Sequence, residues 1–195
     1  MYKLFSLLFS VMLLGGCTTV LHSVTDQPVG KNETSTGLGT DISDFTMDTY
    51  IGVNIKKADP QLDDSHININ VYNAVVLLTG EVPNQRLKVL AGDTARAFKG
   101  VRVVHNELAV RNNSTLMARA NDAILTTKVK AKLAIDEEVR AGDIDVISED
   151  SVVYLMGLVS KSIGAKAANR ARETGGARRV ATVFETLNEQ RMNRQ

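Results

Sequence analysis

The chain has one cysteine, no tryptophan and three histidines among its 195 residues, and its formal net charge is only +1. The single cysteine, Cys17, excludes any intramolecular disulfide. A net charge this close to zero argues against bulk electrostatic binding of nucleic acid, which requires a basic surface. The histidines are spread along the chain, so no second histidine or cysteine stands at the spacing of a metal site.

No group of residues has the pattern of a catalytic site. His22 lies in a polar segment, His66 precedes an expected strand, and His105 lies in or near another. The consecutive acids 136–138 diverge around a helix end and are typical of capping or solvated residues, and Gly175-Gly176 is typical of a helix stop. We therefore expect a non-enzymatic protein that uses no cofactor and no metal.

The N-terminus resembles the export signal of a bacterial lipoprotein. A mainly apolar run from Leu4 to Leu14 follows Lys3. The run is shorter than the roughly 20 apolar residues that cross a bilayer, but it has the length of a secretory signal core. Small residues and Cys17 then close the segment in a pattern that resembles a lipobox, in which the thiol is acylated and the chain is cut before the cysteine.

The lipobox resemblance implies a signal peptide over 1–16, an acyl anchor such as palmitate on Cys17, and attachment to a membrane. Several acyl chains on one residue give stable anchoring, because each buried methylene contributes about 0.8 kcal/mol. Thr18, rather than an aspartate, follows the cysteine, which implies the outer membrane. The alternatives are an ordinary signal peptide with an incidental cysteine, or a short membrane anchor.

The rest of the chain contains an internal repeat. Residues 67–82 and 144–159 match at a shift of 77 positions. In each copy an alternating segment and a second β-rich run are joined by a polar turn, at Asn73-Ala74 or at 149–151, which predicts a β-hairpin. The aligned pairs are Ile67/Ile144, Ile69/Val146, Val76/Val153, Leu78/Leu155, Gly80/Gly157 and Val82/Val159. A glycine within the second strand indicates a bulge or a close approach of backbone.

Helical patterns flank the first hairpin. Met47, Ile51 and Ile55 recur every four residues and predict one buried helix face, which Asp59-Pro60 ends. Pro83-Asn84 opens a second helix. Its inward face comprises Leu87, Ala91, Thr94 and Phe98, and a third strand is expected over 101–110.

The second copy has the same order of elements. Asn121-Asp122 is expected to cap a helix whose inward face comprises Leu125, Val129 and Leu133. Ser160 caps the next helix. The inward face of this helix consists of small residues, Gly164, Ala168 and Ala171. The last strand is expected over 179–187.

These patterns predict an α+β fold of two tandem domains, each αββαβ with two helices packed on a three-stranded mixed sheet. The expected boundaries are a signal peptide at 1–16, a lipidated N-terminus and flexible tether at 17–45, a first domain at 46–111, a linker at 112–120, a second domain at 121–188 and a tail at 189–195.

The repeat resembles the BON domain. The resemblance rests on the glycine in a V-x-L-x-G-x-V strand, the alanine-bearing helix, and the glycine-led strands at 100–104 and 176–180. It covers about 46–187 and is more specific in the second repeat. Two BON domains behind a lipobox imply the αββαβ fold, outer-membrane integrity and binding of anionic phospholipid through the first helix of the second domain.

The lipid-binding residues that the resemblance implies lie on that helix and are Ile124, Thr127, Lys128, Ala131, Lys132 and Ile135. The family often has an exposed aromatic residue at the helix start, where this chain has Ile124. Apolar side chains beside lysines suit an interfacial helix, and each cation near an anionic surface contributes about 1 kcal/mol. The cations of the second repeat, on both of its helices, are separated in sequence by seven acids in 136–150, so one side is expected to be basic. The alternative is that the charges are merely solvated and that Ile124 packs on the first domain.

The resulting expectation is a lipid-anchored protein on the periplasmic face of the outer membrane, with anionic phospholipid as its partner and no role in nucleic-acid binding. Two alternatives remain open at this point. One is a scaffold that docks onto envelope proteins, and the other is a periplasmic stress or chaperone-like protein.

Overall fold

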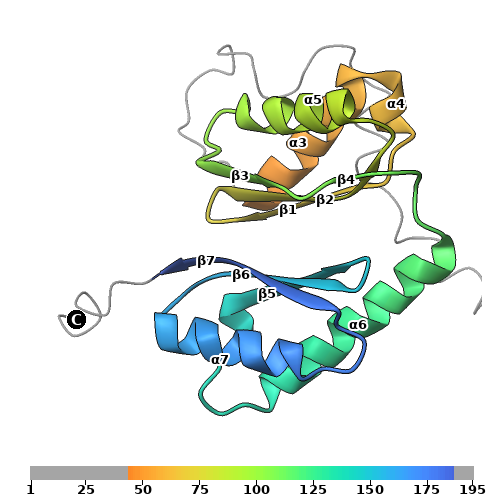
Figure 1. Cartoon of the computed structure of the whole chain (residues 1–195). Helices are drawn as coiled ribbons and strands as arrows, with labels where there is room; N and C mark the ends of the chain where they lie inside the picture. The colour runs from red at the N-terminus through yellow and green to blue at the C-terminus, as the bar shows by residue number, and fades with distance from the viewer. Residues whose placement is uncertain (1–43, 187–195) are drawn as a thin grey trace, which may run out of the picture.

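The structure, a computed structural model, describes residues 44–186, which form two domains of helices on mixed β-sheets (Figure 1). Cys17, nearly all of the expected tether and the expected tail lie outside the described residues. Within residues 44–186, no helix combines the length and the apolar character that crossing a membrane would require.

The first domain contains three helices and four strands. Its elements are α3 (Asp44–Ala58), α4 (Pro60–Asp63), β1 (Ile67–Tyr72), β2 (Val75–Val82), α5 (Gln85–Arg96), β3 (Val103–Asn106) and β4 (Ala109–Val110). β2 is the centre of the sheet, antiparallel to β1 and parallel to both β3 and β4. The expected third strand is thus split in two, and Leu108 at the break is 1% exposed and belongs to the core.

The second domain repeats this plan with fewer elements. They are α6 (Leu116–Ala134), the 3-10 turn η1 (Ala141–Asp143), β5 (Ile144–Glu149), β6 (Val152–Val159), α7 (Lys161–Arg172) and β7 (Arg179–Thr186). β6 is central, antiparallel to β5 and parallel to β7. The predicted α+β class and αββαβ order are confirmed, and α4 and β4 are additions in the first domain.

The apolar residues of the helix faces expected from the sequence are buried, whereas Thr94 of α5 is only half-buried. Met47, Ile51 and Ile55 of α3 lie in the first core, and Leu125 and Val129 of α6 lie in the second. Local capping explains where helices begin: the Asn84 side chain accepts a hydrogen bond from the backbone N–H of Leu87, and Ser160 accepts one from Ile163. α3 ends at Ala58, immediately before Asp59-Pro60, as predicted.

Each hairpin turns through two residues with positive φ. Asn73 and Ala74 have φ of 49° and 59°, and Asp150 and Ser151 repeat these values. Two successive positive φ angles give the turn whose twist matches that of the strands. The repeat therefore extends to the backbone conformation of its turns.

The glycine in the second strand of each hairpin permits a close approach of backbone. Gly80 has φ of 108°, and a Cβ at this position would collide with the carbonyl group of His66. The same carbonyl oxygen accepts a hydrogen bond from the backbone N–H of Glu81 at 2.7 Å. At Gly157 a Cβ would collide with the carbonyl oxygen of Asp143. The expectation of a close approach at these glycines is confirmed.

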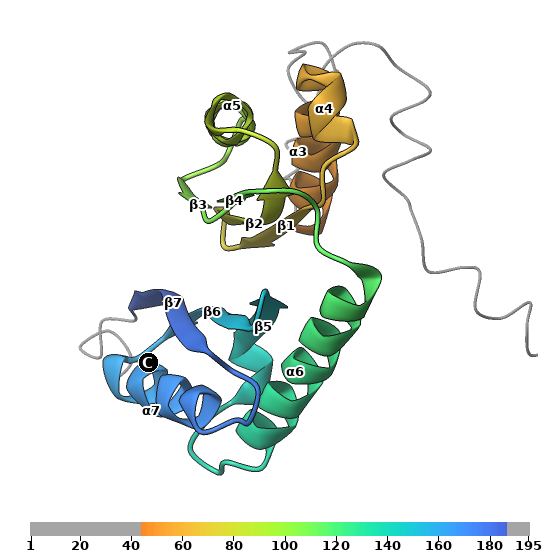
Figure 2. The ribbon, with the colours of Figure 1, turned by 45° about the vertical axis from the view of Figure 1, so that its right-hand side comes forward.

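The two sheets pack against each other, so that the helices of both domains lie on the outside (Figures 1 and 2). Val75 and Leu77 of β2 meet Tyr154 and Met156 of β6 in a third apolar cluster. This packing explains why every residue of β2 is buried, whereas a single helix layer would leave one face of the sheet in water.

One expected helix start is wrong. α6 begins at Leu116, not at Asn121-Asp122, and Thr115 is its N-cap, accepting a hydrogen bond from the Ala118 N–H. Residues 116–120, expected in a linker, are helical. Asp122 instead lies on the buried side of the helix at 7% exposure.

Candidate functional site

The helix α6 has one buried and one exposed face. Asp122, Leu125, Val129 and Leu133 recur every three or four residues and are buried, which places them on one side of the helix. The Asp122 carboxylate accepts hydrogen bonds from the backbone N–H groups of Asp150 and Ser151 at 2.9 and 2.8 Å. Packing and this polar contact therefore fix the rotation of α6 on the second domain.

The opposite face of α6 presents apolar side chains to solvent. Ile124 is 54% exposed and Ile135 is 81% exposed, and at the start of the helix Leu116 and Met117 are 83% and 72% exposed. Seven residues separate Met117 from Ile124, and seven separate Lys128 from Ile135. Because seven residues make about two turns of an α-helix, these side chains lie on one face and form a stripe along the helix. We call Met117, Ile124, Lys128, Ala131 and Ile135 the α6 stripe.

Most of the predicted lipid-binding residues lie together on this exposed side. Ile124, Thr127, Lys128, Ala131 and Ile135 are all exposed. Lys132 is only partly exposed, and its ammonium group donates to the backbone carbonyl of Glu173 at 2.9 Å and lies 3.5 Å from its carboxylate. Lys132 is therefore held at the C-terminal end of α7.

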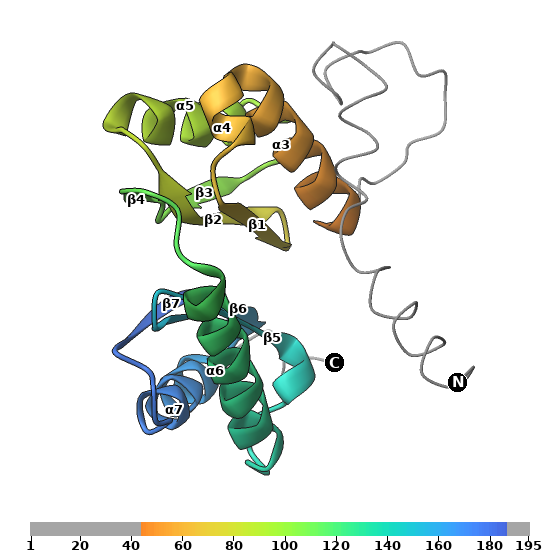
Figure 3. The same ribbon diagram turned by 90° about the vertical axis from the view of Figure 1, so that its right-hand side faces the viewer.

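The alternative in which the first domain covers Ile124 does not match the geometry. The first domain packs on the sheet of the second, whereas α6 lies on the helical side and faces the viewer in Figure 3. The apolar residues of the stripe are exposed in the presence of both domains.

The basic side expected in the second domain is partly neutralised by ion pairs, whereas Lys161 and Arg172 of α7 have no acidic partner among the ion pairs of residues 44–186. Asp136, whose side chain is 3% exposed, contacts Lys166 and Arg170, and Glu138 also pairs with Lys166. The hydrogen bond from Arg170 lowers the pKa of Asp136, so this carboxylate stays ionised. The acids that separate the cations in sequence fold back beside α7. Lys128 and Lys130 on α6 remain exposed.

Sequence reasoning missed Leu116 and Met117, because both were assigned to the linker. The signal was present: two large apolar residues follow Thr115, a residue type that favours the N-cap position. With them, the exposed apolar surface extends from the first turn of α6 to its C-cap residue Ile135.

Polar contacts also join the two domains. Arg102 pairs with Glu185, which in addition accepts a hydrogen bond from the Asn73 side chain at 2.6 Å. Arg111 bridges Glu81 of the first domain and Asp150 of the second at 2.8 and 2.9 Å. These contacts, with the apolar cluster between the sheets, fix the orientation of α6 relative to the first domain.

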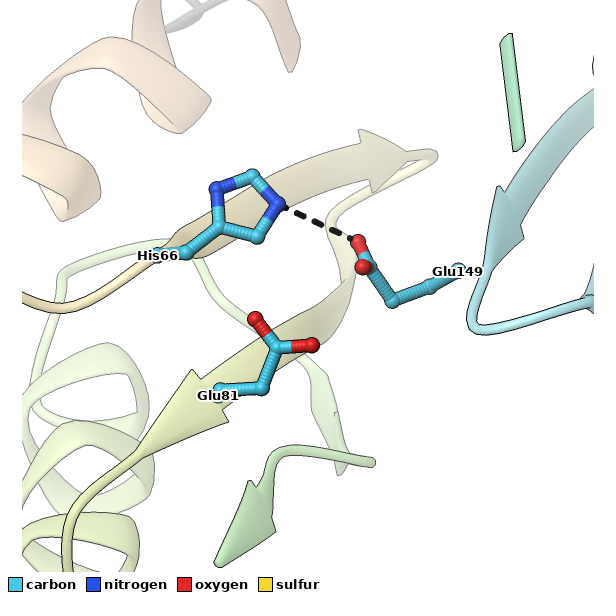
Figure 4. A group of neighbouring side chains, drawn as sticks. All are labelled: His66, Glu81 and Glu149. Atoms are coloured by element: carbon cyan, nitrogen blue, oxygen red, sulfur yellow. Dashed lines mark ion pairs between the residues drawn. The ribbon is translucent and has the colours of Figure 1, made fainter. Parts of the chain in front are cut away.

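A group of metal-ligating side chains lies at the same boundary. His66 and Glu81 come from the first domain and Glu149 from the second, and their ligand atoms all lie within 4.8 Å of one another (Figure 4). The first hairpin brings His66 and Glu81 together, whereas the proximity of Glu149 to them depends on the packing of the domains.

Comparisons with known proteins agree with the repeat. The BON domain family matches residues 51–112 and 121–188. The chain is 34% identical over 187 residues to the outer membrane lipoprotein DolP of Haemophilus influenzae, covering 95% of this chain and 96% of that protein. It is 30% identical over 146 residues to the 21 kDa hemolysin of Actinobacillus pleuropneumoniae, covering 75% of each.

More distant similarities are also present. The osmotically-inducible protein Y of Escherichia coli is 27% identical over 195 residues, with 94% of this chain and 96% of that protein covered. Among solved structures, CdsD of the type III secretion system of Chlamydia trachomatis matches at 11% identity and a TM-score of 0.30, over 78% of this chain and 68% of that one. A structural likeness at this level carries no argument about fold or function.

Proposed function

The chain belongs to the BON domain family, and from this premise we propose that it is an outer-membrane lipoprotein, anchored through acylated Cys17, whose second domain binds anionic phospholipid. The α6 stripe, with exposed isoleucines beside Lys128, is the observation that carries the proposal. The relative named outer membrane lipoprotein DolP, which matches 95% of this chain, supports the location.

The physics of the stripe fits an interfacial helix that lies along a membrane surface. Ile124 and Ile135 each expose apolar area that a bilayer would remove from water, at about 25 cal/mol per Å². Lys128 lies one turn after Ile124 and reaches toward lipid headgroups, where each cation contributes about 1 kcal/mol on an anionic surface. Burial of the isoleucine side chains would insert the helix into the interface, and the positive charge of the lysines would make it prefer anionic lipid.

The acyl anchor and the stripe would act together. An anchor on Cys17 keeps the second domain near the membrane, so that weak lipid contact becomes an intramolecular event with a high effective concentration. The protein would then favour regions of the periplasmic leaflet that are rich in anionic phospholipid, which is how we expect it to support outer-membrane integrity.

Sedimentation with phospholipid vesicles tests the proposal. The chain from Thr18 to Gln195 retains every described helix and strand and carries no lipid. We expect it to bind vesicles that contain phosphatidylglycerol more strongly than vesicles of phosphatidylcholine alone, and we expect added salt to weaken this binding.

Ile124→Glu should reduce binding to anionic vesicles at least tenfold without loss of folding, because Ile124 is exposed. Val89→Glu is the matched control, since Val89 on α5 of the first domain is 48% exposed and receives the same change. Equal binding to neutral and anionic vesicles, or equal losses from the two substitutions, would contradict the proposal.

A further inference from the structure

We propose that His66, Glu81 and Glu149 form a binding site for one divalent cation of the zinc class at the boundary between the two domains. An imidazole and two carboxylates are a ligand set that zinc uses, with a fourth position left to water. Their ligand atoms lie within 4.8 Å of one another, and His66 Nε2 is 3.5 Å from Glu149 Oε2 (Figure 4).

The fold places His66 beside Glu81 for a local reason. Because Gly80 has no Cβ, the backbone of His66 lies directly against β2, where its carbonyl oxygen accepts the hydrogen bond from the Glu81 N–H. Glu81 lies in β2 and its side chain is fully buried, at 0% exposure. A glutamate in the central strand of a sheet indicates a specific polar role, since burying a carboxylate is costly unless a cation compensates it.

The Glu81 carboxylate already pairs with a cationic side chain, that of Arg111. Arg111 donates to one of its carboxylate oxygens at 2.8 Å, and the backbone N–H of Ser114 donates to the other at 3.1 Å. Each carboxylate oxygen can accept more than one contact, so Glu81 retains capacity for a metal ion. Arg111 also pairs with Asp150, which Arg178 contacts as well.

Glu149 has no comparable compensation. Its side chain is 8% exposed, and within residues 44–186 its carboxylate contacts are the Asn68 amide at 2.8 Å and the His66 ring. Asn68 is neutral, and within residues 44–186 no lysine or arginine pairs with the Glu149 carboxylate. The Asn68 amide nitrogen also lies 3.3 Å from His66 Nε2. When Nε2 accepts from this amide, Nε2 and Glu149 Oε2 are two acceptor atoms 3.5 Å apart, and a metal ion would bind both.

The ligand types favour zinc over calcium or magnesium. Those two ions take oxygen ligands, whereas imidazole is a preferred ligand for zinc and other late transition metals. A surface hollow lined by Ser65, Pro83, Arg111 and Asn113 shares Arg111 with the group, since Arg111 contacts Glu81 directly. A bound ion would bridge the first domain, through His66 and Glu81, to the second domain, through Glu149.

The test uses the full-length chain in detergent with Cys17→Ser, which removes the thiol as a competing ligand. Isothermal titration with Zn²⁺ after EDTA treatment should give one site per chain, and zinc should raise the melting temperature because it binds the folded state. Co²⁺ substituted for Zn²⁺ should give the intense visible absorption of a four-coordinate centre.

His66→Asn and Glu149→Gln should each weaken zinc binding at least tenfold and abolish the rise in melting temperature. His105→Asn is the matched control, because it removes another histidine of the first domain and should leave the affinity unchanged. Circular dichroism without metal shows whether each variant is folded. No saturable binding, or equal affinity in the His66 and His105 variants, would overturn the proposal and leave adventitious binding only.

Discussion

Asp44 in the first domain makes the same contact as Asp122 in the second. The Asp44 carboxylate accepts hydrogen bonds from the backbone N–H groups of Asn73 and Ala74 at 2.6 and 2.9 Å, just as Asp122 holds the turn at Asp150 and Ser151. In both domains an aspartate of the first helix thus fixes the hairpin turn of the sheet. The internal repeat has kept this link between helix and sheet even though the helices begin at different places.

We expect Asp122→Ala to destabilise the chain by about 2 to 4 kcal/mol, because the change leaves two turn N–H groups without a charged acceptor. Urea unfolding followed by far-ultraviolet circular dichroism measures the effect. Asp145→Ala is the control, since Asp145 is an exposed residue of β5 and its loss should cost less than about 0.5 kcal/mol. Similar losses in both variants would show that the contact with the turn contributes nothing.

Gly80→Ala should lower the free energy of unfolding by at least about 2 kcal/mol, because Gly80 combines a positive φ with direct contact to the His66 carbonyl. The matched control is Gly175→Ala, since a Cβ at Gly175 meets no heavy atom within 4 Å. Thermal unfolding of the two variants checks this prediction. An unchanged melting temperature in Gly80→Ala would mean that the backbone of His66 can move away from β2 at little cost.

The pairing of Glu185 with Arg102 predicts a pH dependence of the domain contact. The hydrogen bond from Arg102, and then that from Asn73, lower the pKa of Glu185 below its usual value of 4.5. A carboxyl whose folded-state pKa is lowered contributes stability above its unfolded pKa and loses it as the pH falls through the folded value. The difference in melting temperature between the natural chain and Glu185→Gln should therefore shrink between about pH 5 and pH 2.

Glu137→Gln provides the comparison for the pH experiment, because Glu137 is exposed and the substitution makes the same chemical change. Its melting temperature should follow that of the natural chain at every pH. If the difference for Glu185→Gln stays constant as the pH falls, the ion pair with Arg102 does not stabilise the domain contact.

Local signals in the sequence were sufficient for the repeated unit. The spacing of Leu125 and Val129 predicted the buried side of α6, and the glycines at 80 and 157 predicted close backbone contacts. Ile124 is exposed on this helix, and its contact with lipid stays a prediction. These features depend on neighbours within one domain, so a pattern within a few dozen residues records them.

Features that depend on the packing of the domains were not predictable in the same way. The continuous apolar run of β2 is typical of a strand buried on both faces, yet nothing in it indicates that β6 supplies the second cover. The cations of α7 were expected to form a basic surface, but Asp136 neutralises Lys166 and Arg170 once η1 and the preceding loop fold back. The group around Glu149 likewise exists only after the two domains meet.

Binding of phospholipid through α6 can be measured with a single introduced tryptophan, because the chain contains none and the new residue then reports on one site alone. Ile124→Trp places it on the α6 stripe, and Val89→Trp places it on α5 of the first domain. With vesicles that contain phosphatidylglycerol, we expect a blue-shifted emission and quenching by brominated acyl chains for Ile124→Trp, and neither change for Val89→Trp. An emission at position 124 that stays unshifted and unquenched, or that changes no more than at position 89, would contradict binding of phospholipid through α6.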